Sequence, residues 1–205
     1  MIEFENKQSF TQRTIILLVG LFLMGISIAL CSKTGWGADP ITVLYDGIAK
    51  SLHVTLGVAS VIVAIGMVVI TFILDRKQLG VGTLVSPFII QMGIDIAFPL
   101  IKIPSNQMIN FLFFLLGLLG LSLGISMTIC ADVGKGSYDA LLISLSNLFN
   151  KEYTIVRWVI DALLIGLGLC LHGSLTAGTV VAILLLGKCI TFFNKQYKKV
   201  FNNKI

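Results

Sequence analysis

Six apolar segments dominate this sequence, and each is long enough to cross a lipid bilayer. A membrane-spanning helix needs about 20 predominantly apolar residues, and the candidates are residues 14–31, 54–74, 79–101, 108–131, 153–171 and 174–193. The composition agrees, because 56% of the residues are hydrophobic and 12% are charged, against about 25% charged in a soluble domain. The sequence therefore predicts an all-α polytopic membrane protein with six transmembrane helices.

Two shorter apolar segments lie between these spans, and each follows a Gly-x-Gly sequence. Residues 40–52 and 138–149 carry apolar side chains at helical spacing. They are too short to span a bilayer, so we expect two short helices that are interfacial or re-entrant. The other connections are too short for a folded extramembrane domain. Residues of functional interest are therefore expected within or beside the bilayer.

The segment at residues 25–37 recurs at residues 124–136. The two copies read GISIALCSKTGWG and GISMTICADVGKG, and six of the thirteen positions are identical without a gap. Internal repeats are a known construction of membrane transporters, with the substrate site where the copies meet. We therefore divide the chain into a first membrane repeat, residues 1–104, and a second, residues 105–205, which includes the basic C-terminal tail.

The distribution of Lys and Arg predicts the orientation in the membrane. With the N-terminus inside, ten basic residues fall on the cytoplasmic side and three, Lys33, Lys50 and Lys102, fall outside. Both termini are then cytoplasmic, and the basic tail is an orientation signal rather than a nucleic-acid patch. Three spans per repeat is an odd number, so the second repeat is inverted relative to the first. The two Gly-rich turns are then expected on opposite faces of the membrane.

The first Gly-rich turn leads into residues that favour the start of a helix. Gly35 and Gly37 permit a sharp reversal of the backbone, Asp39 suits an N-cap, and Pro40 suits the first helical position. A helix start presents free N–H groups and a partial positive charge that can hold an anion. The alternative is that Asp39 already uses those donors as an ordinary cap, and a carboxylate there competes with an anionic ligand.

The second turn has the same general design. Gly134 and Gly136 precede Ser137, which we expect to cap the short helix, and Asp139 lies in its first turn. The start of the third span, residues 80–83, has a weaker echo at residues 177–179, and small residues at both places favour close helix packing over ligand contacts.

Four ionisable residues lie inside predicted spans, where they are costly and usually face a cavity or a partner. They are Asp95, Arg157, Asp161 and Lys188. Arg157 and Asp161 are four residues apart and can pair on one helix face, as can Gln91 and Asp95. The four charges sum to zero, so a solvated pathway and a network that only locks the bundle are both open. Our candidate contacts for a substrate or ion are Asp39, Gln91, Asp95, Asp139, Arg157, Asp161 and Lys188.

Motifs for catalysis and metal binding are absent from the sequence. The two histidines are isolated, the cysteines form no C-x-x-C pair, and no H-E-x-x-H, G-x-S-x-G or P-loop sequence occurs. We therefore expect no enzyme activity, no cofactor, no metal and no disulfide. Any transport would not be driven by ATP bound to this chain.

Four segments together resemble the YczE/YyaS/YitT family of bacterial membrane proteins: residues 20–30, 35–44, 76–83 and 93–95. Members typically show a G-x-G-x-x-P-W-D-V-L turn. This chain has Gly-Trp-Gly-Ala-Asp-Pro-Ile-Thr-Val-Leu in the first copy, with the proline one place late, and keeps an aromatic-aspartate pair at Tyr138-Asp139 in the second. The resemblance implies a multi-pass protein of the bacterial cytoplasmic membrane, and it implies architecture more than activity.

These observations lead to two hypotheses about function. The first is a secondary transporter or permease-like protein that moves an unidentified small solute between the Gly-rich half-helices. The second is a membrane accessory or regulatory protein whose polar residues only hold helices together. The expected partners are the lipid bilayer and a small molecule or ion. A homo-oligomer is left open, because the twenty glycines would serve packing within one chain as readily as between chains.

Overall fold

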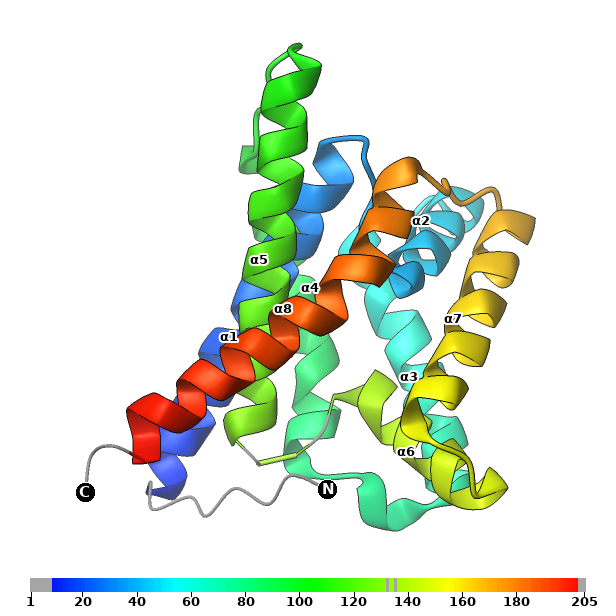
Figure 1. Cartoon of the computed structure of the whole chain (residues 1–205). Helices are drawn as coiled ribbons and strands as arrows, with labels where there is room; N and C mark the ends of the chain where they lie inside the picture. Colours follow the sequence, from blue (N-terminus) through cyan, green and yellow to red (C-terminus); the bar gives the residue numbers. More distant parts are fainter. Residues whose placement is uncertain (1–8, 132, 135, 203–205) are drawn as a thin grey trace.

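The computed structural model describes residues 9–131, 133–134 and 136–202. Lys135, in the second Gly-rich turn, lies outside these residues. The described chain is helical throughout, without strands (Figure 1). Its elements are α1 (Phe10–Lys33), α2 (Pro40–Leu52), α3 (Leu56–Leu74), the 3-10 turn η1 (Arg76–Gln78), α4 (Val81–Leu100), α5 (Gln107–Ala131), α6 (Ser137–Phe149), α7 (Tyr153–Cys170) and α8 (Ala177–Asn202).

Five of the described helices are long and apolar enough to cross a membrane: α1, α3, α4, α5 and α8. This finding supports a helical membrane protein. The sixth predicted span forms α7, an 18-residue helix that is not among the five. The side chains of its first two residues lie outside the described part of the chain. The count of six spans therefore stays a prediction.

The two predicted short helices are present as α2 and α6, each of 13 residues. Both end in a residue with left-handed backbone, His53 (φ 55°) and Asn150 (φ 49°), which terminates the helix. In Figure 1, α2 lies in the upper half of the molecule and α6 in the lower half, and both begin nearer the middle than they end. The helix lengths also recur in order, with 24, 13, 19 and 20 residues followed by 25, 13, 18 and 26.

The start of α2 matches the expectation, and the start of α6 differs from it. Asp39 is the N-cap residue of α2 and Pro40 its first residue, as predicted. In α6, Gly136 is the N-cap residue and Ser137 is already helical, so the prediction of Ser137 as the cap was wrong. The physical reason is that the Gly136 carbonyl accepts the first helical hydrogen bond, from Ala140 N at 2.9 Å.

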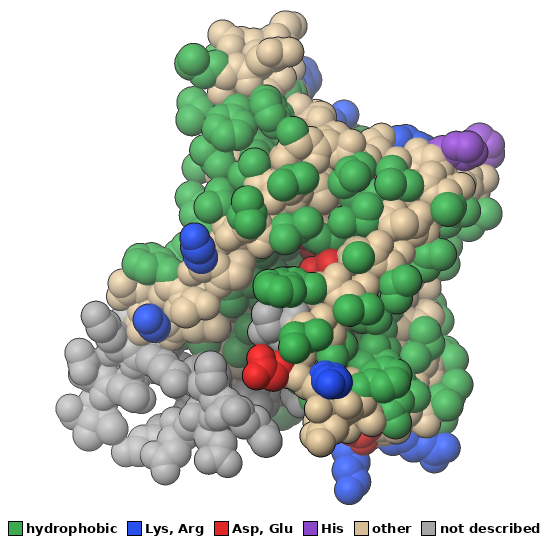
Figure 2. Space-filling view, turned by 45° about the vertical axis from the view of Figure 1, so that its right-hand side comes forward, with side chains coloured by type: hydrophobic (Ala, Val, Ile, Leu, Met, Phe, Trp, Pro, Cys, Tyr) green, Lys and Arg blue, Asp and Glu red, His purple; other side chains and the backbone are tan. Residues whose placement is uncertain are grey.

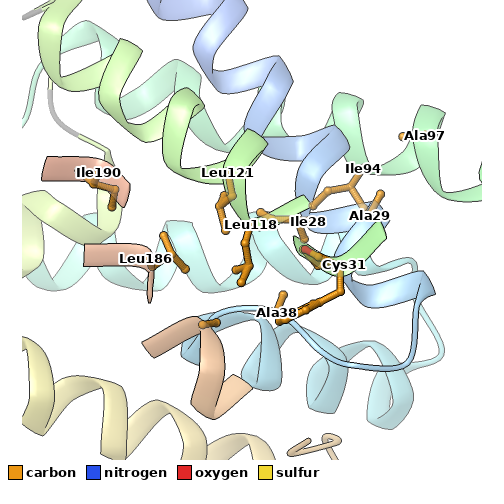
Figure 3. Close-up of a cluster of buried hydrophobic side chains, with 12 residues drawn as sticks. Ile28, Ala29, Cys31, Ala38, Ile94, Ala97, Leu118, Leu121, Leu186 and Ile190 are labelled. Carbon is orange, nitrogen blue, oxygen red and sulfur yellow. The ribbon is translucent and has the colours of Figure 1, made fainter. Parts of the chain in front are cut away.

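The helices form two apolar cores, and each core draws on helices from both halves of the chain. The first lies among α1, α4, α5 and α8, with Ala38 from the first Gly-rich turn; Figure 3 shows Ile28, Ile94, Leu118 and Leu186 directed toward one another. The second lies among α2, α3, α6 and α7. In lipid, such packing depends on close contact rather than on exclusion of water.

Glycines set the closest of these contacts. A Cβ atom on Gly25 of α1 would lie 2.9 Å from Gly93 Cα of α4, and a Cβ on Gly124 of α5 would lie 2.7 Å from the Gly20 carbonyl oxygen of α1. Gly25 and Gly124 are equivalent positions of the sequence repeat. The repeated glycines therefore bring α1 against two neighbours.

A polar cluster ties the end of α2 to the connection between α7 and α8. Asp46 Oδ2 accepts hydrogen bonds from Lys50 Nζ at 2.6 Å and from Ser174 N at 2.7 Å. Lys50 Nζ also donates to Ser174 Oγ at 2.6 Å.

We expect Asp46→Ala to lower the free energy of unfolding by about 1 kcal/mol, because the cluster is partly exposed and loses two hydrogen bonds. Lys50→Met also removes two hydrogen bonds, to Asp46 and to the Ser174 hydroxyl. It should nevertheless cost less, since the bond from the backbone Ser174 N to Asp46 remains. Denaturation of both variants in detergent measures this, and an equal loss in the two would contradict the role given to Ser174.

Candidate functional site

The starts of both short helices approach the middle of α7, where a polar group lies. Tyr138, in the first turn of α6, donates a hydrogen bond from its hydroxyl to Asp161 Oδ1. Arg157 Nε lies 3.7 Å from Asp161 Oδ2, which confirms the pairing predicted from their spacing. The Arg157 guanidinium also lies 5.8 Å from the centre of the Tyr138 ring. Asp161 is only 8% exposed, so this group is buried in the bundle.

Asp39 reaches the same group from the start of α2. Its carboxylate interacts electrostatically with both Asp161 and Arg157, and the Thr42 hydroxyl donates to its Oδ1. The Asp39 side chain makes no capping hydrogen bond to α2. Asp39 therefore occupies the N-cap position without the side-chain hydrogen bond of an ordinary cap, and its contact with a ligand stays a prediction. We call Asp39, Thr42, Tyr138, Arg157 and Asp161 the polar group.

Close packing of α2 on α7 brings these residues together. A Cβ atom on Gly168 of α7 would lie 2.7 Å from the Val43 carbonyl oxygen, and one on Gly47 would lie 2.7 Å from the Gly168 carbonyl oxygen. No side chain separates the two backbones there. This contact holds the start of α2, and with it Asp39, beside α7.

The other charged candidates lie elsewhere. Lys188 is exposed on α8 and borders a cavity of about 410 Å³ with Lys195 and Thr191. The Asp95 carboxylate packs against α3, where a Cβ on Gly57 would lie 2.5 Å from Asp95 Oδ1. Gln91 is partly buried on the same helix as Asp95, and no hydrogen bond joins the two within the described residues. The four charges that sum to zero in the sequence therefore do not form one group.

Asp139 lies in the first turn of α6, partly buried, next to the polar group in sequence. Its Oδ2 would be 3.7 Å from a Cβ on Gly136. The neighbouring Tyr138, rather than Asp139, supplies the contact to Asp161.

Three of the four glycines in the two Gly-rich turns lie where the backbone conformation favours glycine. Gly35 (φ 75°), Gly37 (φ 85°) and Gly134 (φ 151°) adopt positive φ, whereas Gly136 (φ −58°) does not. Gly134 also packs against the start of α4, with Gly82 N 2.9 Å from where its Cβ would be.

The equivalent contact exists at the first turn. Gly37 packs against the start of α8, where Thr179 Oγ1 would lie 2.8 Å from its Cβ, and Thr176 Oγ1 donates to the Trp36 carbonyl. Each Gly-rich turn thus meets the small residues that begin a helix of the other half, which supports the packing interpretation of residues 80–83 and 177–179.

A second cavity, of about 360 Å³, lies at the first turn. It is lined by Thr34, Trp36, Gln107, Asn110 and Thr176 among others. Asn110 Oδ1 is buried and has no hydrogen-bond partner among the described residues. The sequence analysis missed this cavity, because its polar residues come from three segments without a common motif.

Sequence reasoning also missed Thr42, Tyr45 and Tyr138 as site residues. Tyr45 is 7% exposed, and the charge of Asp39 acts on it. Helical spacing assigned Tyr45 and Tyr138 to apolar faces, and both do pack in the second core. The hydroxyl group of Tyr138 nevertheless reaches Asp161, which spacing along one helix does not reveal.

Comparison with known proteins gives a family and two relatives. A family described as "Family of unknown function (DUF6198)" matches residues 11–195. An uncharacterized protein of Haemophilus influenzae is 28% identical over 178 residues, 87% of this chain and 81% of the relative. The uncharacterized protein YyaS of Bacillus subtilis is 24% identical over 189 residues, 91% of this chain and 94% of the relative.

The YyaS relative agrees with the resemblance found in the sequence, and both relatives are bacterial. No solved structure matches the chain. Because the family match covers most of its length, this chain belongs to the DUF6198 family, a family of unknown function.

Proposed function

We propose that this protein is a secondary transporter or permease-like protein of the bacterial cytoplasmic membrane, which moves a small solute. The observation that carries the proposal is the polar group, where the starts of two short helices meet a charged long helix near its middle. In many transporters, the substrate site lies at such a meeting of half-helices from two repeats. The proposal includes no catalytic step.

The proposed architecture consists of two inverted three-span repeats with both termini in the cytoplasm. The recurring helix lengths, the paired turn contacts and the opposite placement of α2 and α6 support it. In this arrangement, α2 and α6 are re-entrant. The Gly-rich turn before each helix dips into the membrane from one face, and the helix starts near the midplane and returns to the same face.

Labelling of the two short helices tests the inversion. Leu52 and Phe149 are the last residues of α2 and α6 and are 57% and 63% exposed. In intact cells, we expect a membrane-impermeant maleimide to label Leu52→Cys from outside and to label Phe149→Cys only after the membrane is opened. The unmodified chain gives the background from its own cysteines. Labelling of both variants from one side would contradict inverted repeats.

A ligand screen tests the transport proposal. A compound that binds the folded state raises Tm, so we expect at least one small metabolite or ion to stabilise the purified protein. Cells lacking the protein should then take up or release that compound at an altered rate. If no compound stabilises the protein and uptake of the screened compounds is unchanged in the deletion strain, the transport proposal fails.

One observation favours the second candidate, a membrane accessory protein. Tyr138 and Arg157 both contact Asp161, and neither cavity described above is lined by these residues. A polar group that only locks three helices together would have such contacts. The variants of Arg157 analysed in the Discussion separate this role from ligand binding.

A further inference from the structure

Lys188 lies on the outer side of an apolar helix. The candidate membrane span of α8 covers Ala177–Tyr197, and Lys188 is near its middle. The helix buries Ala182, Leu186 and Ile190, which pack in the first core. Successive residues of a helix are about 100° apart around its axis, so Lys188 faces away from that core, where its side chain is exposed. An exposed charge at membrane depth is costly unless a counter-charge accompanies it.

A second lysine follows on the same face of α8. Lys195 comes about two helical turns after Lys188, and both lysines border the cavity of about 410 Å³. Thr191 and Phe192 line the cavity between them. Gly187 lines it as well, and nothing lies within 4 Å of a Cβ atom built there, so the missing side chain leaves the space open. Two positive charges therefore share one hollow on the surface of α8.

The described part of the chain supplies no counter-charge to these two lysines. Neither Lys188 nor Lys195 forms a side-chain ion pair or hydrogen bond there, and no described Asp or Glu lines the cavity. The Thr191 hydroxyl already donates to the Gly187 carbonyl at 2.9 Å. Each ammonium group has three N–H donors. Both are thus available to an anion with several acceptor oxygens, such as a phosphate.

The surroundings of the hollow favour an anion that also carries an apolar part. Phe192, which lines the hollow, is 56% exposed, and Leu184, one turn before Lys188, is also exposed. Figure 2 shows basic side chains toward the C-terminal end of α8 with apolar side chains beside them. A phospholipid combines a phosphate with acyl chains, and basic residues beside membrane-spanning helices attract anionic head groups.

We propose that an anionic phospholipid binds in this hollow, with its phosphate between Lys188 and Lys195 and an acyl chain along the outer face of α8 beside Phe192. The phosphate supplies the counter-charge that Lys188 requires at membrane depth. The acyl chain covers apolar surface that a soluble anion would leave uncovered. This lipid site is independent of the proposed transport function and is compatible with either candidate function.

The test adds three probes to the purified protein in a neutral detergent: dioleoylphosphatidylglycerol, dioleoylphosphatidylcholine and inorganic phosphate. The two lipids share their acyl chains and a phosphate, and only the first has a net negative charge. We expect phosphatidylglycerol to raise Tm in a saturable manner and the other two probes to raise it less at equal concentration. The proposal is overturned if phosphatidylcholine or phosphate alone stabilises as strongly, or if phosphatidylglycerol has no effect.

Variants that remove one charge locate the binding. Lys188→Gln and Lys195→Gln should each weaken the apparent affinity for phosphatidylglycerol at least 5-fold. Both side chains are exposed, so these variants should fold, and Tm without added lipid checks this. Lys151→Gln is the matched control, because Lys151 is exposed between α6 and α7 and does not line the cavity. Unchanged affinity in both site variants, or an equal loss in the control, would overturn the proposal.

A variant that keeps every charge tests the hollow itself. Gly187→Leu places a side chain in the cavity, and the open space at Gly187 accepts its Cβ without a clash. We expect the apparent affinity for phosphatidylglycerol to fall at least 5-fold, although both lysines remain. Unchanged affinity in the folded variant would mean that the lysines attract lipid without the cavity, and the proposed site would be overturned.

Discussion

Arg157→Leu should lower the free energy of unfolding by about 3 kcal/mol. Removal of one partner from a buried ion pair typically costs about 3–5 kcal/mol, because the other charge is left buried without compensation. Here two carboxylates, Asp39 and Asp161, lose their cation together. We expect the lower end of that range, because the Arg157 side chain is 28% exposed. Unfolding of the protein in mixed micelles, as the proportion of a denaturing detergent is increased, measures the change.

The double variant Arg157→Leu with Asp161→Leu should recover much of this loss. Replacing both partners of a buried pair by apolar residues is often nearly neutral, and the group then again carries one negative charge, on Asp39. Arg157→Lys, which keeps the charge, should cost less than Arg157→Leu. If the double variant is as unstable as the single one, pairing with Asp161 is not the reason for the loss.

The same double variant separates the two functions. An accessory protein whose polar group only locks the helices should keep its function once the double variant folds. A transporter should fold and yet lose its ligand, because Asp161 is part of the proposed site. Stability and ligand binding measured on one preparation therefore decide between these roles.

Local sequence signals predicted those features that depend on neighbours along the chain. Residues 40–52 were correctly predicted as a short helix, with Asp39 and Pro40 at its start, because glycine, cap and proline preferences act over a few residues. The pairing of Arg157 with Asp161 was predicted for the same reason, since they are one helical turn apart.

The composition of the polar group could not be predicted in this way. Asp39 comes within electrostatic range of Asp161 because glycines of α2 and α7 let the two backbones touch. Lys188 was a candidate because it lies in an apolar segment. The packing of α8 against α5, however, determines which face of α8 carries Lys188. A single sequence contains no direct signal for either arrangement, so both became apparent only in three dimensions.

Gly25→Ala should lower the free energy of unfolding by about 2 kcal/mol, within the about 1–3 kcal/mol typical of overpacking. The added Cβ would lie 2.9 Å from Gly93 Cα and 3.0 Å from Ile94 N of α4, and it would also meet the Ile90 carbonyl oxygen. These are backbone atoms, so no flexible side chain can move aside. The two helices would have to separate, which disturbs the core between α1 and α4. Unfolding in detergent measures the loss.

Gly66→Ala is the matched control for this argument. Gly66 lies inside α3, and nothing comes within 4 Å of a Cβ built there. The same substitution should then raise stability by about 0.5–1 kcal/mol, because alanine loses less backbone freedom in a helix than glycine does. Opposite signs for two identical substitutions would show that Gly25 is required for close approach of α1 and α4. A stabilising Gly25→Ala would mean instead that this crossing is looser than described, and the position of α4 beside α1 would need revision.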